Sequence, residues 1–373
     1  MAADSEEWRW WLALARVSGV GPVTYRALIE TVGAPHAIFS TSIATVAGVP
    51  GCGRKIAAAI QRFSGWDEVD AEVARLAALG ADLLTWNDPR YPVHLRTIHD
   101  PPPFLYLLGD LAPDQRRVVA IVGSRRATPY GVAVARRIAA DLARAGFVIV
   151  SGMARGIDSA AHDGALSVGG STVAVLGCGV DVVYPPESRS LKSTIQTHGA
   201  VVSELPLGSA PDPHHFPARN RIISGVAMGV LVVEASAESG SLITARLASE
   251  QGREVFAVPG NVGSSTSHGT NRLIKAGATL VETAEDLIEE LVGPLGEARI
   301  QPPITDPVAS LRLTAEEAKL FDALTLEPSH VDEITARTRM APEQVVSLLL
   351  GLELKGVARQ IAGHRYVRDH GVG

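Results

Sequence analysis

The sequence of 373 residues contains only two cysteines, Cys52 and Cys178, which lie far apart in the chain. Two isolated cysteines provide neither a disulfide framework nor the ligand spacing of a zinc site. Long apolar runs are missing as well, since stretches such as residues 226–233 are much shorter than the roughly 20 residues of a membrane-spanning helix. The opening residues, MAADSEEWRWW, lack the basic-then-apolar order of a signal peptide. We therefore expect a cytoplasmic protein without a metal centre or a membrane segment.

Positive charge is also scarce. Lysine and arginine total 34 against 40 aspartates and glutamates, which gives a formal net charge of −6. An acidic chain does not attract nucleic acid over its whole surface, because that attraction scales with the cations presented to the phosphates. Any site for a polyanion must then be local.

The composition is that of a folded chain with many tight turns, because hydrophobic residues make up 46% and there are 36 glycines and 23 prolines. Since single cores rarely grow past roughly 250 to 300 residues, we expect two or three domains. Residues 1–66 predict a domain of short helices. Two stretches in it, 17–28 and 46–60, place glycines before an amphipathic helix, as in a helix-hairpin-helix. Glycine turns that join an ordinary helical bundle explain these stretches equally well.

Residues 67–116 predict a linker and extension that packs on the core. A helical pattern at 67–80 is followed by prolines at 89, 92, 101, 102 and 103. These prolines exclude a regular helix and stiffen an extended connection.

Residues 117–292 alternate apolar runs with helical patterns. Continuous apolar strands indicate a sheet covered on both faces, so we predict a doubly wound, mostly parallel α/β sheet of the Rossmann-like kind. Ligands bind such sheets at the carboxyl ends of the strands. The seven predicted strands are residues 118–123, 147–152, 172–177, 200–205, 229–235, 254–260 and 278–282.

A second linker is predicted at 293–307 and a small domain at 308–373. Three helical patterns followed by a short hairpin have the order of a winged helix. The third pattern sets only Lys355 against Glu343 and Glu353, a poor charge balance for a DNA groove. A duplex-binding regulator is therefore the weaker of the nucleic-acid hypotheses.

Three of the predicted strands end in turns that suit an anion. Glycine lets the backbone approach a ligand, serine offers a hydroxyl, and a helix N-terminus adds partial positive charge. An arginine in such a turn can bind a phosphate or lie against a base. The candidate binding residues in these turns are Gly123, Ser124 and Arg125; Gly152, Arg155 and Gly156; and Ser239, Gly240 and Ser241.

The stretch HHFPARNRIISG, residues 214–225, concentrates cations and rings in a chain that is acidic overall. Its arginines are expected just before a helix that starts near Asn220, at the same edge of the sheet. Cations for phosphates, with rings or guanidinium planes for bases, are what single-stranded nucleic acid requires. The candidate binding residues here are His215, Phe216, Arg219, Asn220 and Arg221. An alternative for either arginine is a buried ion pair with Glu204 or Glu234, and we expect one of the two to form it.

A nucleotide-cleaving or nucleotide-sensing enzyme is the main alternative. Glu234 and Glu238 lie near one strand end, and paired carboxylates can cleave glycosidic bonds. Acids at strand ends also serve simply to cap helices. Asp158 and His162 have structural explanations as a helix cap and a packed residue. Neither a dinucleotide-binding fingerprint nor a P-loop is present, so we expect no cofactor.

Seven segments, taken in order, carry a resemblance to a known family. They are VGSRRATPYG, SGMARGIDSAAHDGAL, VLGCGVDVVYPPE, SELPLG, HFPARNRIISG, VVEASAESGSLITARLASEQGREVFAVPG and GTNRLIKAGATLV. Together they resemble the DNA-processing protein A family, also called DprA or Smf, over about residues 70–290. The flanking domains are similar to the SAM-like and DML1-like winged-helix domains that some members of the family carry.

The resemblance implies a single-stranded DNA-binding protein of natural transformation and recombination, with no catalysis. Such proteins protect incoming strands, load RecA onto them, overcome the single-strand-binding protein and act as homodimers. In the family, the turn matched by Gly123, Ser124 and Arg125 and the run matched by Phe216, Arg219, Asn220 and Arg221 line the DNA pocket. Pro213 stands where many members have a lysine, which removes one expected phosphate contact. Leu273 and Ile274 resemble part of the dimer and RecA-facing surface, although a place in the core would also explain them.

Overall fold

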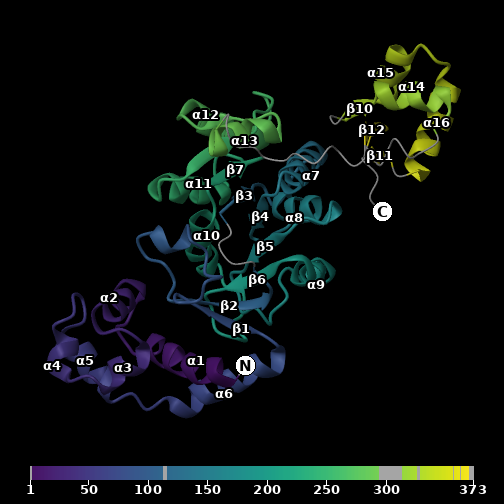
Figure 1. Ribbon diagram of the computed structural model, residues 1–373. Helices are drawn as coiled ribbons and strands as arrows, with labels where there is room; N and C mark the ends of the chain where they lie inside the picture. The colour runs from purple at the N-terminus through teal and green to yellow at the C-terminus, as the bar shows by residue number, and fades with distance from the viewer. Residues whose placement is uncertain are drawn as a thin grey trace.

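The computed structural model describes residues 2–111, 116–293, 313–325, 328–355, 357–361 and 363–368 (Figure 1). They form an N-terminal group of helices, a nine-stranded sheet with helices on both faces, and a C-terminal winged helix. In these ranges we find no helix with both the length and the apolar character needed to cross a bilayer. The predicted α/β class with two flanking helical domains is thus confirmed.

The N-terminal helices surround a cluster of aromatic rings. Trp10, Phe39, Phe63 and Trp66 lie with neighbouring ring centroids 5.1 to 5.9 Å apart. The Arg9 guanidinium carbon lies 4.4 Å from the Trp66 ring centroid. Even partial burial of such large rings stabilises a small group of helices. The helices are α1 Ala2–Ala15, α2 Pro22–Val32, α3 Pro35–Ser40, α4 Ile43–Ala47 and α5 Gly53–Gln61.

Both predicted glycine turns occur between helices. Gly19 has φ 92° between α1 and α2, Gly51 has φ 78° between α4 and α5, and Gly53, the first residue of α5, has φ 62°. These left-handed backbone conformations favour glycine over any residue with a Cβ atom. The turns therefore explain the glycine pattern of both stretches.

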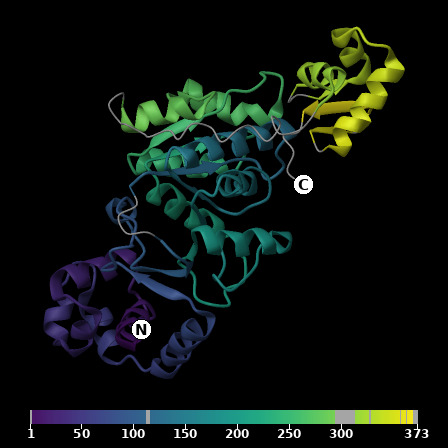
Figure 2. The ribbon, with the colours of Figure 1, turned by 45° about the vertical axis from the view of Figure 1, so that its right-hand side comes forward.

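Helix α6, Trp66–Leu79, joins the N-terminal helices to the sheet through one buried carboxylate. Glu72 is 4% exposed and accepts hydrogen bonds from the Arg16 guanidinium, the Tyr106 hydroxyl at 2.8 Å and the Leu207 backbone N–H at 3.4 Å. Apolar residues of the helices and of one face of the sheet form one continuous core. The two parts therefore share an interior, with the helices beside the β1 end of the sheet in both ribbon views (Figures 1 and 2).

The large sheet has the strand order β1-β2-β6-β5-β4-β3-β7-β8-β9. From β6 to β9 in this order all neighbouring strands are parallel. All seven predicted strands are present. The strands are β1 Asp82–Thr85, β2 Phe104–Gly109, β3 Val118–Val122, β4 Val148–Ser151, β5 Thr172–Val175, β6 Ala200–Ser203, β7 Gly229–Val232, β8 Glu254–Ala257 and β9 Thr279–Leu280.

Two strands appear where the sequence analysis expected only an extended connection. β2 pairs antiparallel with β6, and β1 pairs antiparallel with β2, so residues 82–109 extend the sheet at one edge. The prolines that argued against regular structure lie in the loop between these strands, where the missing N–H costs no ladder hydrogen bond. That part of the prediction is therefore corrected.

Helices cover the sheet on both faces, as the continuous apolar strands predicted. Val119 and Ile121 of β3 pack in the core beneath α7, α8 and α13, whereas Ala120 and Val122 pack in the core beneath α10 and α11. This layering leaves the carboxyl ends of the central strands open to a ligand. The helices are α7 Pro129–Arg144, α8 Ile157–Ser167, α9 Arg189–His198, α10 His215–Val226, α11 Ser241–Glu250, α12 His268–Lys275 and α13 Ala284–Val292, with short 3-10 turns at Leu95–Thr97, Pro186–Ser188 and Ser265–Ser267.

The C-terminal domain has the predicted order of three helices and a hairpin. Thr314 and Glu317 form a reciprocal capping box at the start of the first helix, and Gly363 turns the hairpin with φ 86°. A short strand before the second helix pairs with the hairpin in a small sheet of order β10-β12-β11. The elements are α14 Ala315–Ala323, β10 Ser329–His330, α15 Val331–Thr338, α16 Pro342–Leu354, β11 Ala358–Ile361 and β12 Arg365–Arg368.

Both cysteines are free and buried. Cys52 packs among the N-terminal helices and Cys178 follows β5, in the same continuous core. Burial raises the pKa of both thiols. They therefore pack as small apolar residues, as predicted.

Candidate nucleic-acid interface

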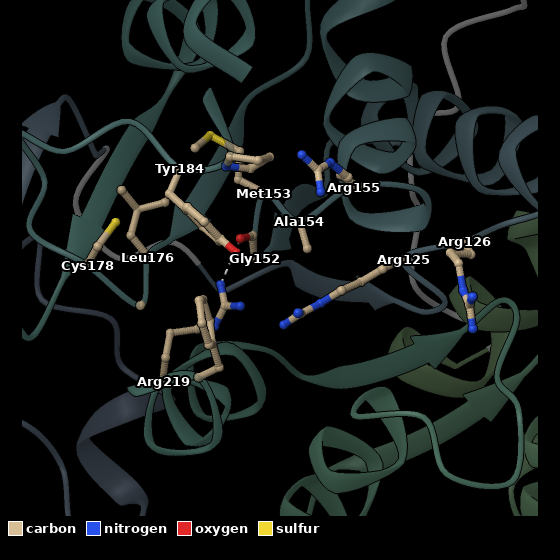
Figure 3. A pocket seen from close by; sticks show the side chains of 13 residues that line it. Arg125, Arg126, Gly152, Met153, Ala154, Arg155, Leu176, Cys178, Tyr184 and Arg219 are labelled. Atoms are coloured by element: carbon tan, nitrogen blue, oxygen red, sulfur yellow. Dashed lines mark hydrogen bonds between the residues drawn. The ribbon is translucent and has the colours of Figure 1, made fainter. Parts of the chain in front are cut away.

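A pocket opens at the carboxyl ends of β4 and β5, beside the turn that follows β3 (Figure 3). This is the sheet edge where the sequence analysis expected a ligand. The pocket combines arginines with apolar and aromatic side chains from stretches far apart in the sequence. The lining residues are Arg125, Arg126, Gly152, Met153, Ala154, Arg155, Leu176, Gly177, Cys178, Tyr184, Pro185, Phe216 and Arg219.

Phe216 lies close to two guanidinium groups and a second ring. The guanidinium carbons of Arg125 and Arg219 lie 5.2 Å and 5.8 Å from its ring centroid. The Tyr184 ring centroid is 5.7 Å away, with the two ring planes inclined at 36°. Arg125 and Arg219 reach into the pocket from opposite sides (Figure 3). Flat groups that can stack under a base thus stand beside cations that can bind phosphates.

Arg219 is buried and held by the protein itself. Its Nη1 donates to the Gly152 carbonyl at 2.8 Å and also to the Val175 carbonyl. Burial is the main reason that its pKa is lowered to about 10, partly offset by the nearby Asp158 carboxylate. At neutral pH the guanidinium stays charged, so Arg219 supplies a fixed positive charge at the base of the pocket.

A second, more polar hollow lies on the other side of Arg125. Gly123, Ser124, Arg125 and Arg126 line it together with the turn Ser239–Ser241 at the start of α11. A third hollow shares lining residues with the aromatic pocket and with the polar one. Asn220 and Arg219 line this third hollow. The hydroxyls of Ser239 and Ser241 lie 2.8 Å apart. Arg125 thus separates an aromatic pocket from a polar one that is rich in hydroxyls and backbone amides.

The glycines of the site fall into two groups. A Cβ atom on Gly152 would lie 2.2 Å from Arg219 Nη1, one on Gly156 would lie 2.3 Å from the Ser124 carbonyl oxygen, and one on Gly123 would lie 2.6 Å from Ile157 Cγ1. These three are therefore required by the packing of the protein itself. A Cβ on Gly240 would have nothing within 4 Å. Gly240 is the glycine whose backbone is open to a ligand.

The structure corrects the start of the helix that carries the paired arginines. Helix α10 begins at His215 rather than near Asn220, so Arg219 and Arg221 lie inside it. Residues two apart on a helix point in different directions. Arg219 consequently faces the pocket, whereas Arg221 pairs with Glu204 at 2.5 Å and Asp100 at 3.2 Å. The expectation that one of the two arginines pairs with Glu204 or Glu234 is confirmed, although the Arg221–Glu204 pair is only partly buried.

Two other candidate residues occupy peripheral places. His215 is the first residue of α10 and is not among those that line the pockets described above. Arg155 lines the aromatic pocket at its rim, and its Nε donates to the Glu187 carboxylate. That hydrogen bond raises the Arg155 pKa and lowers the Glu187 pKa.

Several lining residues were not singled out from the sequence. Tyr184 and Pro185 come from the loop after β5, and Met153, Leu176 and Cys178 supply the apolar wall. The segment VLGCGVDVVYPPE, which contains Tyr184, entered the sequence analysis only as part of the family resemblance. A tyrosine placed shortly after a strand end, where ligands bind, was the signal that could have identified it.

Three of the titratable residues considered with the enzyme hypothesis, Glu234, Asp158 and His162, have structural partners. Glu234 accepts from the Thr128 backbone N–H at 2.9 Å and from the Thr128 hydroxyl at 2.5 Å, so it caps the start of α7. Asp158 is not the cap of α8, which begins after Gly156; it lies in the first turn and accepts from the Ala154 N–H at 3.4 Å. The buried His162 Nδ1 lies 2.7 Å from the Thr172 hydroxyl oxygen. Glu238 is exposed. No two of these groups form a general acid and base pair across the pocket.

Family profiles match most of the described chain. Residues 82–292 match the DNA recombination-mediator protein A family, residues 304–364 match the DprA winged-helix domain, and residues 12–63 match a SAM-like helix-hairpin-helix tandem. The last match agrees with the helix-hairpin-helix alternative for the N-terminal glycine turns.

Curated relatives match over nearly the full length. A protein Smf of Synechocystis is 36% identical over 98% of this chain and 100% of its own length. A protein Smf of Escherichia coli is 42% identical over 83% of each chain, and a putative DNA processing protein DprA of Mycobacterium tuberculosis is 36% identical over 98% of this chain and 95% of its own.

Solved structures give the same result. DNA processing protein A of Streptococcus pneumoniae superposes with a TM-score of 0.66 at 35% identity, covering 76% of this chain and 98% of the other. DNA processing protein A of Helicobacter pylori, whose single-stranded DNA binding mode was the subject of that structure, gives a TM-score of 0.51 at 32% identity, covering 57% and 95%. Because the family profile covers more than half of the chain and these relatives match it over most of their length, the chain belongs to the DNA recombination-mediator protein A family, DprA.

Proposed function

We propose that this protein binds single-stranded DNA at the pocket around Phe216. The observation that carries the proposal is the position of Arg125. Its guanidinium lies near the Phe216 ring on one side, and on the other side it lines the polar hollow together with the turn Ser239–Ser241. One base could lie against the rings while the adjoining phosphates meet the guanidinium and the backbone amides. A duplex presents no unstacked base to such a pocket, so a preference for single strands follows.

The biological setting follows from the family. We propose that the protein protects single strands during natural transformation and recombination, competes with the single-strand-binding protein and delivers the strands to RecA as a homodimer. The segment expected at the dimer and RecA surface falls on α12. Leu273 packs against the core beneath α10 and α11, and Ile274 is half-buried. Ile274 is therefore the better candidate of the two for a contact with another molecule.

The winged helix offers little to a duplex. Its third helix, α16, exposes Val346, Leu350 and Leu354 at 51%, 57% and 83%, one turn apart along the helix. Contacts to a DNA groove are dominated by cations for the phosphates, which an apolar stripe cannot provide. The pocket at the sheet edge is therefore the better DNA site in the described part of the chain.

The substitution Arg125→Ala tests the proposal. It removes a phosphate contact and one face of the stacking site, so we expect about a tenfold loss of affinity for labelled oligo(dT), at the lower end of the roughly 1 to 3 kcal/mol that one stacked base contributes. Fluorescence anisotropy at two salt concentrations is the measurement. The log–log salt slope should also fall in magnitude by about 0.7, because one fewer phosphate is neutralised.

The matched control is Arg246→Ala. Arg246 is an exposed arginine on α11 whose partner is Glu250, one turn further along the same helix. Its loss changes the net charge as Arg125→Ala does, but we expect the affinity to stay within about twofold of the wild type. Equal weakening by both substitutions, or tighter binding to the duplex than to oligo(dT), would contradict the assignment of the pocket.

A further inference from the structure

Arg155, at the rim of the aromatic pocket, already pairs with an acidic residue of the same chain. Arg155 Nε donates to the Glu187 carboxylate, and the side chains are 63% and 52% exposed. Arg155 lines the aromatic pocket together with Arg125 and Phe216. In the free protein its positive charge is therefore directed at a carboxylate and is partly lost to an incoming phosphate.

Glu187 is held in this place by an anchored loop. The buried Lys192 ammonium donates to the Val180 and Val182 carbonyls, the second at 3.1 Å. The Ser188 backbone N–H donates to the Pro185 carbonyl at 3.0 Å, which closes the turn that carries Glu187. The same loop places Tyr184 against Phe216. The ring that would stack on a base and the acid that occupies Arg155 thus come from one fixed segment.

The pair is easily broken by a phosphate. Both side chains face solvent, so water and salt screen their attraction. A phosphate offers an arginine two oxygens in a bidentate geometry, which makes the stronger contact. Once Arg155 turns to the strand, however, the Glu187 carboxylate remains beside a polyanion. Its repulsion then opposes binding.

We propose that Glu187 is a built-in competitor for Arg155 that sets the affinity of the pocket for single-stranded DNA. The inference rests on the proposed function. It assigns to Glu187 a role opposite to that of the other rim residues, since its removal should improve binding. A helix-capping role for an acid ahead of α9 predicts no such gain.

The test compares wild type with Glu187→Gln, using full-length protein and labelled oligo(dT) at low salt. We expect three- to tenfold tighter binding by the variant. The log–log salt slope of binding should be steeper by about 0.7 for the variant than for wild type. In the variant Arg155 neutralises one phosphate, and no carboxylate beside the strand offsets that charge. Thermal unfolding should be unchanged, since the pair is exposed.

Two controls separate the pair from a general charge effect. Glu250→Gln frees Arg246 from another exposed pair and should leave binding within twofold of the wild type. In an Arg155→Gln background, Glu187→Gln should give less than half of its usual gain, on a logarithmic scale. A full gain in that background, or no gain in the wild-type background, overturns the inference.

Binding by the wild type distinguishes a failure of this inference from a failure of the proposed function on which it rests. If wild type binds oligo(dT) and Arg125→Ala weakens that binding while Glu187→Gln does not strengthen it, the competitor role alone fails. If neither wild type nor Glu187→Gln binds oligo(dT), the proposed function fails and the inference with it.

Discussion

Replacement of Glu72 by leucine is expected to lower the free energy of unfolding by about 3 to 5 kcal/mol, the range for removal of one partner of a buried ion pair. The same type of change at Asp70, two residues closer to the N-terminus on α6, should have almost no effect. The two carboxylates bind arginines of the same neighbouring region, Arg16 and Arg9, and differ mainly in burial. Glu72 is 4% exposed, whereas half of the Asp70 side chain is exposed.

The large effect at Glu72 comes from the donors that it leaves behind. The Tyr106 hydroxyl and the Leu207 N–H are both buried, and each would lose its acceptor. A buried donor without a partner costs about 1 to 3 kcal/mol. Glu72→Gln keeps the shape and one acceptor oxygen, so it should fall between Glu72→Leu and wild type.

Tryptophan fluorescence is a suitable measurement, because the five tryptophans at positions 8, 10, 11, 66 and 86 all lie in the N-terminal helices or next to β1. Urea unfolding followed by this signal and by circular dichroism of the sheet should give one shared transition in wild type. Equal midpoints for Glu72→Leu and Asp70→Leu would contradict the role assigned to the buried carboxylate.

The second large effect is a loss of folding stability at acidic pH, which we attribute to the buried imidazole of His162. Thr172 donates its hydroxyl proton to the Ile149 carbonyl at 2.7 Å, so His162 Nδ1 must be the donor to the Thr172 oxygen. The proton of the neutral ring therefore sits on Nδ1. Nε2 is buried without a hydrogen-bond partner among the described residues. Burial and the nearby Arg219 charge lower the His162 pKa to about 3.

Stability should consequently decline as pH falls below the usual histidine range. The unfolded chain binds a proton near pH 6.5, whereas the folded chain does so only near pH 3, so acid favours unfolding within that window. Between pH 8 and pH 5 the loss attributable to His162 is about 2 kcal/mol. Asp158 acts in the opposite direction, because burial raises its pKa and protonation then favours the folded state.

The variant His162→Asn isolates this contribution, since its amide can donate to Thr172 and does not titrate. Its stability at pH 8 will be lower, but the further loss between pH 8 and pH 5 should be about 2 kcal/mol smaller than in wild type. Urea titrations at the two pH values give the four free energies. An identical pH dependence in both proteins would show that His162 takes up its proton in the folded state.

The central sheet could be predicted because its strands are buried on both faces. Such strands are short apolar runs, and all seven were located from the sequence. β1 and β2 were missed because the prolines between them dominated the interpretation, although FLYLLG of β2 is as apolar as the strands that were found. Prolines exclude a strand only where they stand in the ladder, and here they stand in the loop.

The candidate site was predictable in outline but not in its side-chain partners. Arg125, Phe216 and Arg219 meet because strand ends of a parallel sheet share one edge. Which of Arg219 and Arg221 would face the pocket depended on the first residue of α10, which lies five residues before the predicted start. Tyr184 and Glu187 come from an irregular loop whose path is fixed by Lys192, a tertiary contact with no periodic signal in the sequence.

The burial of both native thiols makes this protein convenient for labelling chemistry. Maleimides react with exposed thiolates, and neither Cys52 nor Cys178 offers one at neutral pH. A single cysteine introduced at Val262, which is 85% exposed, would therefore be modified selectively without removal of the native residues. A fluorophore attached there could follow the arrival of a strand in real time on an otherwise unaltered chain.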